Sequence, residues 1–138
     1  MKPKHFPPTD PREWLRRARS NLAHSRAEAE EIDPAELCFD AQQAAEKAIK
    51  AVFIHRGEAF PFTHDLEALI RLLKANGQKV PKYVEAAKVL TRFAVAARYP
   101  DFTAVTRRSY DRSVRIASAV LRWAERQIAP PSKGKGKP

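Results

Sequence analysis

The sequence has a single cysteine, Cys38, and only 4 glycines among its 138 residues. One cysteine cannot form a disulfide within the chain, so we expect a fold that does not depend on oxidation and a reducing, cytoplasmic setting. No apolar run approaches the roughly 20 residues that span a bilayer, and residues 1–11 lack the apolar core of a secretory signal. These absences predict a protein without membrane contact, and scarce glycine favours helices over turn-rich β structure.

Patterns typical of metal sites and hydrolases are also missing. The histidines His5, His24, His55 and His64 include no pair four residues apart, and no cysteine or carboxylate cluster accompanies them. The chain has no nucleophile elbow and no Gly-rich phosphate loop. We therefore expect no metal, no cofactor and no catalytic residue of these classes.

Positive charge is in excess, with a formal net charge of +10. Five of the lysines lie in residues 1–9 and 129–138, which contain no acidic residue. Removing those lysines leaves 21 basic and 16 acidic residues, so the body of the chain carries about +5. This moderate charge favours anionic partners without identifying one.

Residues 37–53 are the stretch around which we expect the fold to be organised. Apolar residues recur there at helical spacing, and several of them are alanines. Small side chains let another helix approach closely, which predicts a central helix with neighbours on more than one side. Asp33 and Pro34 supply the start of this helix and Gly57 its end. Its other faces carry Gln42, Gln43, Glu46, Lys47 and Lys50.

Four further helices are predicted by similar signals. Asp10 and Pro11 repeat the start signal, and Thr63 is the expected cap of the third helix. Phe60 and Phe62 precede that cap, and we expect both to fold back over the end of the bundle. The expected helices cover residues 11–31, 34–56, 64–76, 80–97 and from 103–106 to 128.

This pattern predicts an all-α, up-and-down bundle of about five helices. A connection of only about two residues makes the first two helices antiparallel neighbours. We expect an extended arm at residues 1–10, the bundle at residues 11–128 and a flexible Lys/Gly/Pro tail at residues 129–138. Trp123 lies off the core stripe of the last helix, so it either marks an interface or covers the core.

Two short stretches concentrate polar groups at helix boundaries. Residues 63–65 lie at an expected helix N-terminus, where a phosphate or an acidic partner binds well, although ordinary capping with a surface histidine is the simpler interpretation. Residues 98–101 put a cation, an aromatic ring and an acid on a corner between helices. Arg98 would hold a phosphate while Tyr99 stacks a base; alternatively, Arg98 pairs with Asp101 and Tyr99 packs.

Arginines also form one stripe on the first expected helix and another on the last. Guanidinium groups bind phosphate oxygens well, so the stripes would suit a phosphate-tracking surface. Solvated helix faces are the alternative interpretation. The stripes consist of Arg12, Arg16, Arg19 and Arg26, and of Arg108, Arg112, Arg115, Arg122 and Arg126.

Four ordered motifs together carry a resemblance to a known family. They are Trp14-Leu15 with Ala18 and Leu22, the run Cys38-Phe-Asp-Ala-Gln-Gln-Ala-Ala-Glu-Lys-Ala-Ile-Lys-Ala51, Thr63-His64-Asp65-Leu66, and Ala97-Arg98-Tyr99-Pro100-Asp101. With these motifs and the helix from Tyr110 to Trp123, the chain resembles the HEPN family, the higher eukaryote and prokaryote nucleotide-binding domain, over about residues 12–128. The resemblance implies a helical bundle, usually a homodimer, that is frequently paired with a small nucleotidyltransferase in toxin–antitoxin-like modules.

Many HEPN proteins are ribonucleases that carry an Arg-x(4–6)-His motif late in the bundle, and this sequence departs from that pattern. His64 is its last histidine, and the Arg19–His24 spacing lies on the first helix, where the family motif does not sit. Without a nearby imidazole, acid–base chemistry on a ribose hydroxyl lacks its usual agent.

The sequence therefore favours a non-catalytic or weakly active binding module, which engages a nucleotidyltransferase partner and a nucleotide or RNA phosphate. A metal-independent ribonuclease toxin with a divergent active site and a purely structural interaction module are the alternatives. The candidate contact residues are Gln43, Lys47, His64, Asp65, Arg98, Tyr99 and Asp101.

Overall fold

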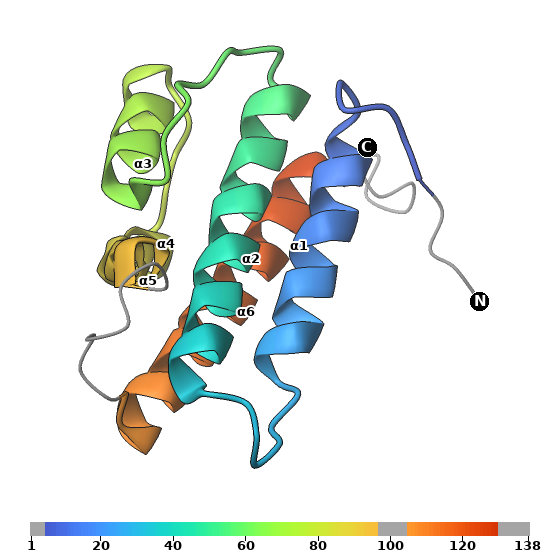
Figure 1. Cartoon of the computed structure of the whole chain (residues 1–138). Coiled ribbons are helices and arrows are strands. Elements are labelled where there is room, and N and C mark those ends of the chain that lie inside the picture. The colour runs from blue at the N-terminus through green and yellow to red at the C-terminus, as the bar shows by residue number, and fades with distance from the viewer. Residues whose placement is uncertain (1–4, 97–104, 130–138) are drawn as a thin grey trace, which may run out of the picture.

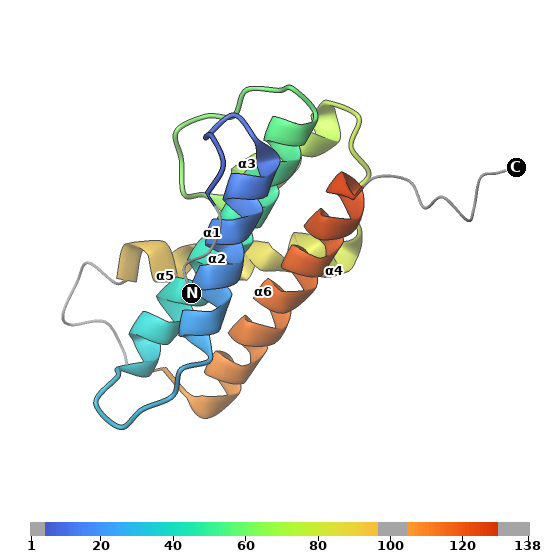
Figure 2. The same cartoon turned by 90° about the vertical axis from the view of Figure 1, so that its right-hand side faces the viewer.

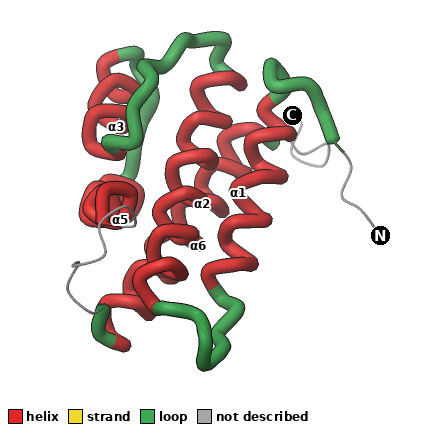
Figure 3. The backbone as a smooth tube through the Cα atoms, in the orientation of Figure 1, coloured by secondary structure: helices red, strands yellow, loops and turns green. Residues whose placement is uncertain are grey.

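The computed structural model describes residues 5–96 and 105–129, and in these ranges every regular element is a helix (Figure 3). The elements are α1 (Pro11–Ser25), α2 (Pro34–His55), α3 (Leu66–Ala75), α4 (Lys82–Glu85), the 3-10 helix η1 (Ala86–Leu90), α5 (Thr91–Ala96) and α6 (Arg107–Ile128). The predicted all-α bundle is confirmed. None of the described helices is long and apolar enough to cross a membrane.

The long helix α2 is the centre of the bundle. It packs against α1 and α6 on one side, and α3, η1 and α5 lie on its other side (Figures 1 and 2). Its alanines explain this position: Ala41, Ala44, Ala45 and Ala48 are fully buried, and their small side chains let the neighbouring helices approach closely. The expectation of an alanine-lined central helix is confirmed.

The predicted starts of α1 and α2 and the predicted end of α2 are confirmed by the structure. The Asp10 and Asp33 side chains accept hydrogen bonds from the backbone amides of Arg12 and Ala35, both at 2.9 Å, so both caps form as predicted. Gly57 follows α2 with a φ of 69°, in the left-handed region that glycine adopts readily.

The first helix is shorter than predicted, because α1 ends at Ser25 and not near residue 31. The Ser25 carbonyl accepts a hydrogen bond from the hydroxyl of Tyr110 on α6, at 2.6 Å, in place of a further helical amide. The acids of residues 28–31 would oppose the dipole at a helix C-terminus, and they lie instead in a connection that spans residues 26–33. The expected two-residue link is therefore wrong, although one of these acids, Glu28, does find a basic partner in Arg107.

The single helix expected over residues 80–97 is broken into α4, η1 and α5. Val84, Ala87, Leu90 and Phe93 are all buried and recur every three residues. That spacing matches the three residues per turn of a 3-10 helix, so the tighter coil of η1 keeps Ala87 and Leu90 on one face. The same four residues all fall within the single helix that was expected over residues 80–97.

The predictions for three aromatic side chains, Phe60, Phe62 and Trp123, agree with the structure to different degrees. Phe60 packs on Trp14 and Phe53, with ring centroids 5.6 and 5.7 Å apart, so it covers the bundle end as expected. Phe62 is fully exposed, and the expectation that it folds back is wrong. Trp123 is buried at 3% exposure, which makes it a core residue.

Candidate functional site

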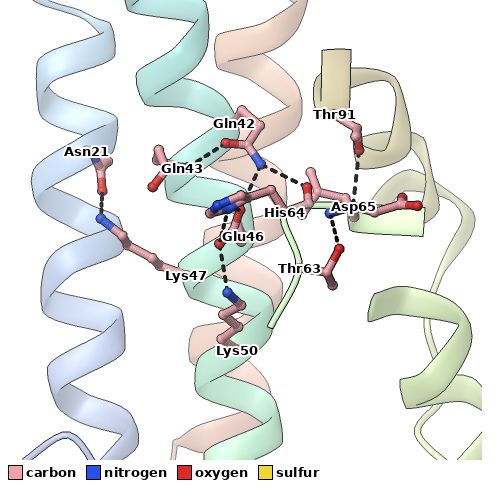
Figure 4. Close-up of polar contacts among 11 residues, drawn as sticks. Asn21, Gln42, Gln43, Glu46, Lys47, Lys50, Thr63, His64, Asp65 and Thr91 are labelled. Carbon is pink, nitrogen blue, oxygen red and sulfur yellow. Dashed lines mark hydrogen bonds and ion pairs between the residues drawn. The ribbon is translucent and has the colours of Figure 1, made fainter. Parts of the chain in front are cut away.

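A stripe of polar side chains runs along α2 on the side that faces the segment before α3 (Figure 4). Gln42, Glu46 and Lys50 are spaced four residues apart, so they lie above one another on one face of the helix. All three are buried, with exposures of 0%, 3% and 8%. Buried polar groups are costly unless they are paired, so their partners decide what this stripe can do.

The Glu46 carboxylate is the acceptor shared by three donors. Gln42 Nε2 lies 2.9 Å from its Oε1, Lys50 Nζ lies 2.8 Å from its Oε2, and His64 Nδ1 lies 3.0 Å from its Oε1. Burial acts to raise the pKa of Glu46, but the hydrogen bonds from Lys50, Gln42 and His64 outweigh it and hold the pKa below its ordinary value. The group therefore stays ionised inside the bundle.

Lys50 is covered by an aromatic ring. Its Nζ lies 5.1 Å from the ring centroid of Phe60, the side chain that folds back from the loop after α2. Phe60 therefore shields the Glu46–Lys50 pair from water and adds a cation–π contact. The four-residue spacing of Glu46 and Lys50 can be read from the sequence, but the burial of the pair is seen only in the structure.

His64 is the part of this network that reaches the surface. Its side chain is 43% exposed, and its Nδ1 faces the buried carboxylate of Glu46. Its backbone carbonyl accepts a hydrogen bond from Gln42 Nε2 at 3.3 Å, which fixes the segment before α3 to α2. Within the described residues, Nε2 of His64 forms no hydrogen bond, so this nitrogen is available to a ligand.

Of the other predicted contact residues, Gln43 joins the network and Lys47 does not. Gln43 Nε2 donates to Gln42 Oε1 at 2.7 Å, next to Glu46. Lys47 points toward α1, where its Nζ donates to Asn21 Oδ1 at 2.7 Å (Figure 4). Burial lowers the pKa of Lys47, and the nearby charge of Arg17 lowers it further.

Asp65 has a structural role in the described part of the chain. It is the N-cap of α3, and its Oδ1 accepts hydrogen bonds from the amides of Glu67 and Ala68 at 3.0 and 3.3 Å. Thr63, the predicted cap, instead accepts a hydrogen bond from the Asp65 amide at 3.1 Å. The prediction of the capping residue is therefore wrong by two positions.

The remaining predicted contacts, Arg98, Tyr99 and Asp101, lie outside the described residues. Conversely, the sequence analysis left Gln42, Glu46 and Asn21 out of the site. Gln42 and Glu46 could have been predicted from the sequence. Together with Lys50 they are spaced four residues apart on the central helix, and polar residues buried there require hydrogen-bond partners. Within residues 5–96 and 105–129, no group of three or more His, Cys, Asp or Glu side chains is placed to hold a metal ion.

The arginine stripe of α1 is largely neutralised by carboxylates. Arg12 pairs with Asp10, and Arg16 with Glu13, each at 2.7 Å. Arg19 reaches across to Glu125 of α6, also at 2.7 Å. Only the Arg19–Glu125 pair links two helices. All three arginines are less suited to an external phosphate than unpaired ones would be.

Comparisons with known proteins agree with this architecture. The family model of the HEPN domain matches residues 11–127. The protein TT1696 from Thermus thermophilus is 34% identical, with a TM-score of 0.72, over 85% of this chain and 97% of that one. ST0689, an archaeal HEPN homologue, is 23% identical, with a TM-score of 0.68, over 87% of this chain and 98% of that one. No curated protein matches the sequence.

Proposed function

Because this chain belongs to the HEPN domain family, we propose that it is a nucleotide- or RNA-associated binding module. In this proposal it forms a homodimer in the cytoplasm and associates with a small nucleotidyltransferase in a toxin–antitoxin-like pair. It binds its ligand without cleaving it.

The observation that carries the proposal is the half-exposed imidazole of His64, held through Nδ1 by the buried Glu46 carboxylate. A carboxylate on one ring nitrogen orients the ring and leaves the other nitrogen for the ligand. Gln43 lies beside it as a second polar contact. A nucleotide offers phosphate oxygens and hydroxyl groups that suit both side chains. Arg98 and Tyr99 would add phosphate pairing and base stacking.

The order of the histidines supports binding without cleavage. His64 is the last histidine in the sequence, so no Arg-x(4–6)-His motif follows it. The Arg19–His24 spacing lies on α1, and Arg19 is paired with Glu125. The usual acid–base agent of the family's ribonucleases is therefore missing from its usual place.

Fluorescence anisotropy with a labelled RNA, at low salt, tests this function. We expect His64→Asn to weaken binding about tenfold, the loss of one good polar contact to a charged group. His24→Asn is the matched control, because His24 is an exposed histidine on α1 outside the network. Equal affinity of both variants and wild type would reject the site, and no binding by any of them would favour a structural interaction module.

The Glu46–His64 pair also gives the ribonuclease alternative a specific basis. A buried carboxylate that orients an imidazole is the arrangement of a general base, and the sequence alone did not locate such a group here. If this alternative holds, purified protein cleaves RNA without added metal, and cleavage is lost in His64→Asn but kept in His24→Asn. Intact RNA with wild-type protein supports the binding module.

The partner proposal needs its own measurement. We expect co-expression with a small nucleotidyltransferase encoded beside this chain to yield one complex on size-exclusion chromatography. Separate elution of the two proteins at micromolar concentration would reject the partnership and leave the ligand proposal standing.

A further inference from the structure

A hollow of about 600 Å³ lies where α6 meets the end of α1 and the α4–η1 segment. The helix α6 contacts both α1 and α4 (Figure 2). Three arginines line the hollow, Arg26 from the end of α1 and Arg115 and Arg122 from α6, and no acidic residue does. The hollow shares no residue with the Glu46–His64 network.

Two of these arginines converge on one hydroxyl group. Arg26 Nη2 donates to Ser118 Oγ at 3.2 Å, and Arg122 Nη1 donates to the same oxygen at 2.7 Å. Ser118 is buried, with 7% exposure, so this oxygen is a fixed point in the wall of the hollow. A neutral hydroxyl holds both guanidinium groups in place but does not cancel their mutual repulsion.

All the arginines within α1, and Arg107 of α6, have carboxylate partners, whereas Arg108, Arg112 and Arg126 of α6 form no ion pair within the described residues. Arg12, Arg16, Arg17 and Arg19 of α1 and Arg107 of α6 are each paired with an Asp or Glu side chain. Within the described ranges, Arg26, Arg115 and Arg122 form no ion pair. Like charges held together without a counterion are the electrostatic signature of an anion site, and guanidinium forks suit phosphate in particular.

The rest of the hollow indicates what the anion is attached to. Most of its wall is apolar, with Val114 and Ile116 of α6 among the lining residues. Tyr83 of α4 stands at its rim, 46% exposed, and its hydroxyl accepts a hydrogen bond from Arg126 Nη2 at 2.8 Å. A fixed, accessible aromatic ring beside a phosphate site is suited to stacking a base.

We infer that this hollow binds a nucleoside monophosphate group, either free or at the end of an RNA strand. The phosphate lies between the guanidinium groups of Arg26 and Arg122, where it supplies the missing counterion. The base lies on the apolar wall against Tyr83, and Arg115 adds charge at the edge. This inference goes beyond the proposed function, because it assigns a second anion site on residues that the His64 site does not use.

Isothermal titration of the full chain with AMP, inorganic phosphate and adenosine tests this site. We expect AMP to bind most tightly, phosphate more weakly and adenosine least, since only AMP uses both the arginines and the ring. Arg122→Ala and Arg26→Ala should each weaken AMP binding roughly 10- to 100-fold, the loss of a hydrogen-bonded charge pair. Arg108→Ala is the matched control: it removes the same charge from an exposed position of α6 outside the hollow, and we expect less than about a twofold change.

Further variants keep the test decisive if an alanine variant unfolds. Arg122→Lys retains the charge but loses the fork, so an intermediate affinity is expected, and Tyr83→Ala should reduce AMP binding toward that of phosphate alone. Equal affinity for AMP and phosphate, or equal losses in the Arg122 and Arg108 variants, would overturn the inference. An RNA oligonucleotide with and without a terminal phosphate distinguishes the two ligand sources: dependence on that phosphate identifies the strand end, and its absence identifies the free nucleotide.

The His64→Asn variant separates this inference from the proposed function. AMP binding that survives in His64→Asn but is lost in Arg122→Ala supports the hollow. The reverse pattern rejects the hollow and leaves the His64 site intact.

Discussion

Removal of the Glu46 carboxylate should be among the most damaging single substitutions in this protein. Glu46→Ala leaves the Lys50 ammonium, whose side chain is 10% exposed, without its counterion. It also removes the acceptor of His64 Nδ1 and one of the two acceptors of the buried Gln42 amide. Breaking a buried ion pair from one side typically costs about 3–5 kcal/mol. Domains of this kind have a free energy of unfolding of roughly 5–15 kcal/mol, so the variant should lose a large part of its stability.

Urea unfolding monitored by circular dichroism measures this loss. Glu67→Ala is the control, because Glu67 lies on α3 with a 54% exposed side chain and a distant partner, Arg71 at 3.8 Å; its cost should stay below about 0.5 kcal/mol. The double substitution Glu46→Leu with Lys50→Met should recover much of the loss, since it removes both charges and refills the space. A cost for Glu46→Ala no larger than the control, or a double variant whose cost equals the sum of the single ones, would refute the buried network.

The same network fixes the sign of a pH effect. The pKa of Glu46 is lower in the folded state than in the unfolded chain, so the stabilisation is present above about pH 4.3, the ordinary value for glutamate. It is lost as the pH falls through the folded-state pKa. The difference in unfolding free energy between wild type and Glu46→Gln should therefore shrink as the solution is acidified below that value. A difference that stays constant in this range would show that folding does not lower the pKa of Glu46.

Three further predictions each rest on a single contact in the structure. Asp65→Ala should lower the unfolding free energy by about 1 kcal/mol through loss of the α3 cap, without changing RNA affinity; an affinity loss at equal stability would restore Asp65 as a ligand contact. Tyr110→Phe should cost about 1–2 kcal/mol in urea unfolding, because it leaves the Ser25 carbonyl unpaired; no loss would contradict the short α1. The pKa of Lys47 measured by NMR should lie below its ordinary value and rise in Arg17→Ala; an unchanged value would contradict their proximity.

The parts of the fold that could be predicted from the sequence are those set by neighbouring residues. Asp10 with Pro11, Asp33 with Pro34, and Gly57 act within one helical turn, so the starts of α1 and α2 and the end of α2 were correctly predicted. The end of α1 depends on the hydroxyl of Tyr110, 85 residues away along the chain, and no local pattern contains that information. The local sequence pattern therefore predicted a first helix that is longer than the observed α1.

The candidate site, too, could be predicted only in part from the sequence. The sequence shows the polar residues at positions 42–50 and predicts His64 as a contact residue. Only the fold shows that His64 meets this stretch through Glu46. The same holds for the hollow beside α6. The arginine stripes were visible, yet the sequence does not show that Arg19 is neutralised by Glu125 while Arg26 and Arg122 share Ser118.

The bond between Tyr110 and Ser25 also bears on how the chain folds during synthesis. The α1–α2 hairpin leaves the ribosome early, but the residue that completes the last turn of α1 belongs to the final helix. Until α6 is released, the part of α2 that packs on α6 is uncovered, and the nascent hairpin exposes an apolar surface to other chains. Closing such a long loop is slow compared with hairpin formation, so docking of the last helix should limit the rate at which the chain matures.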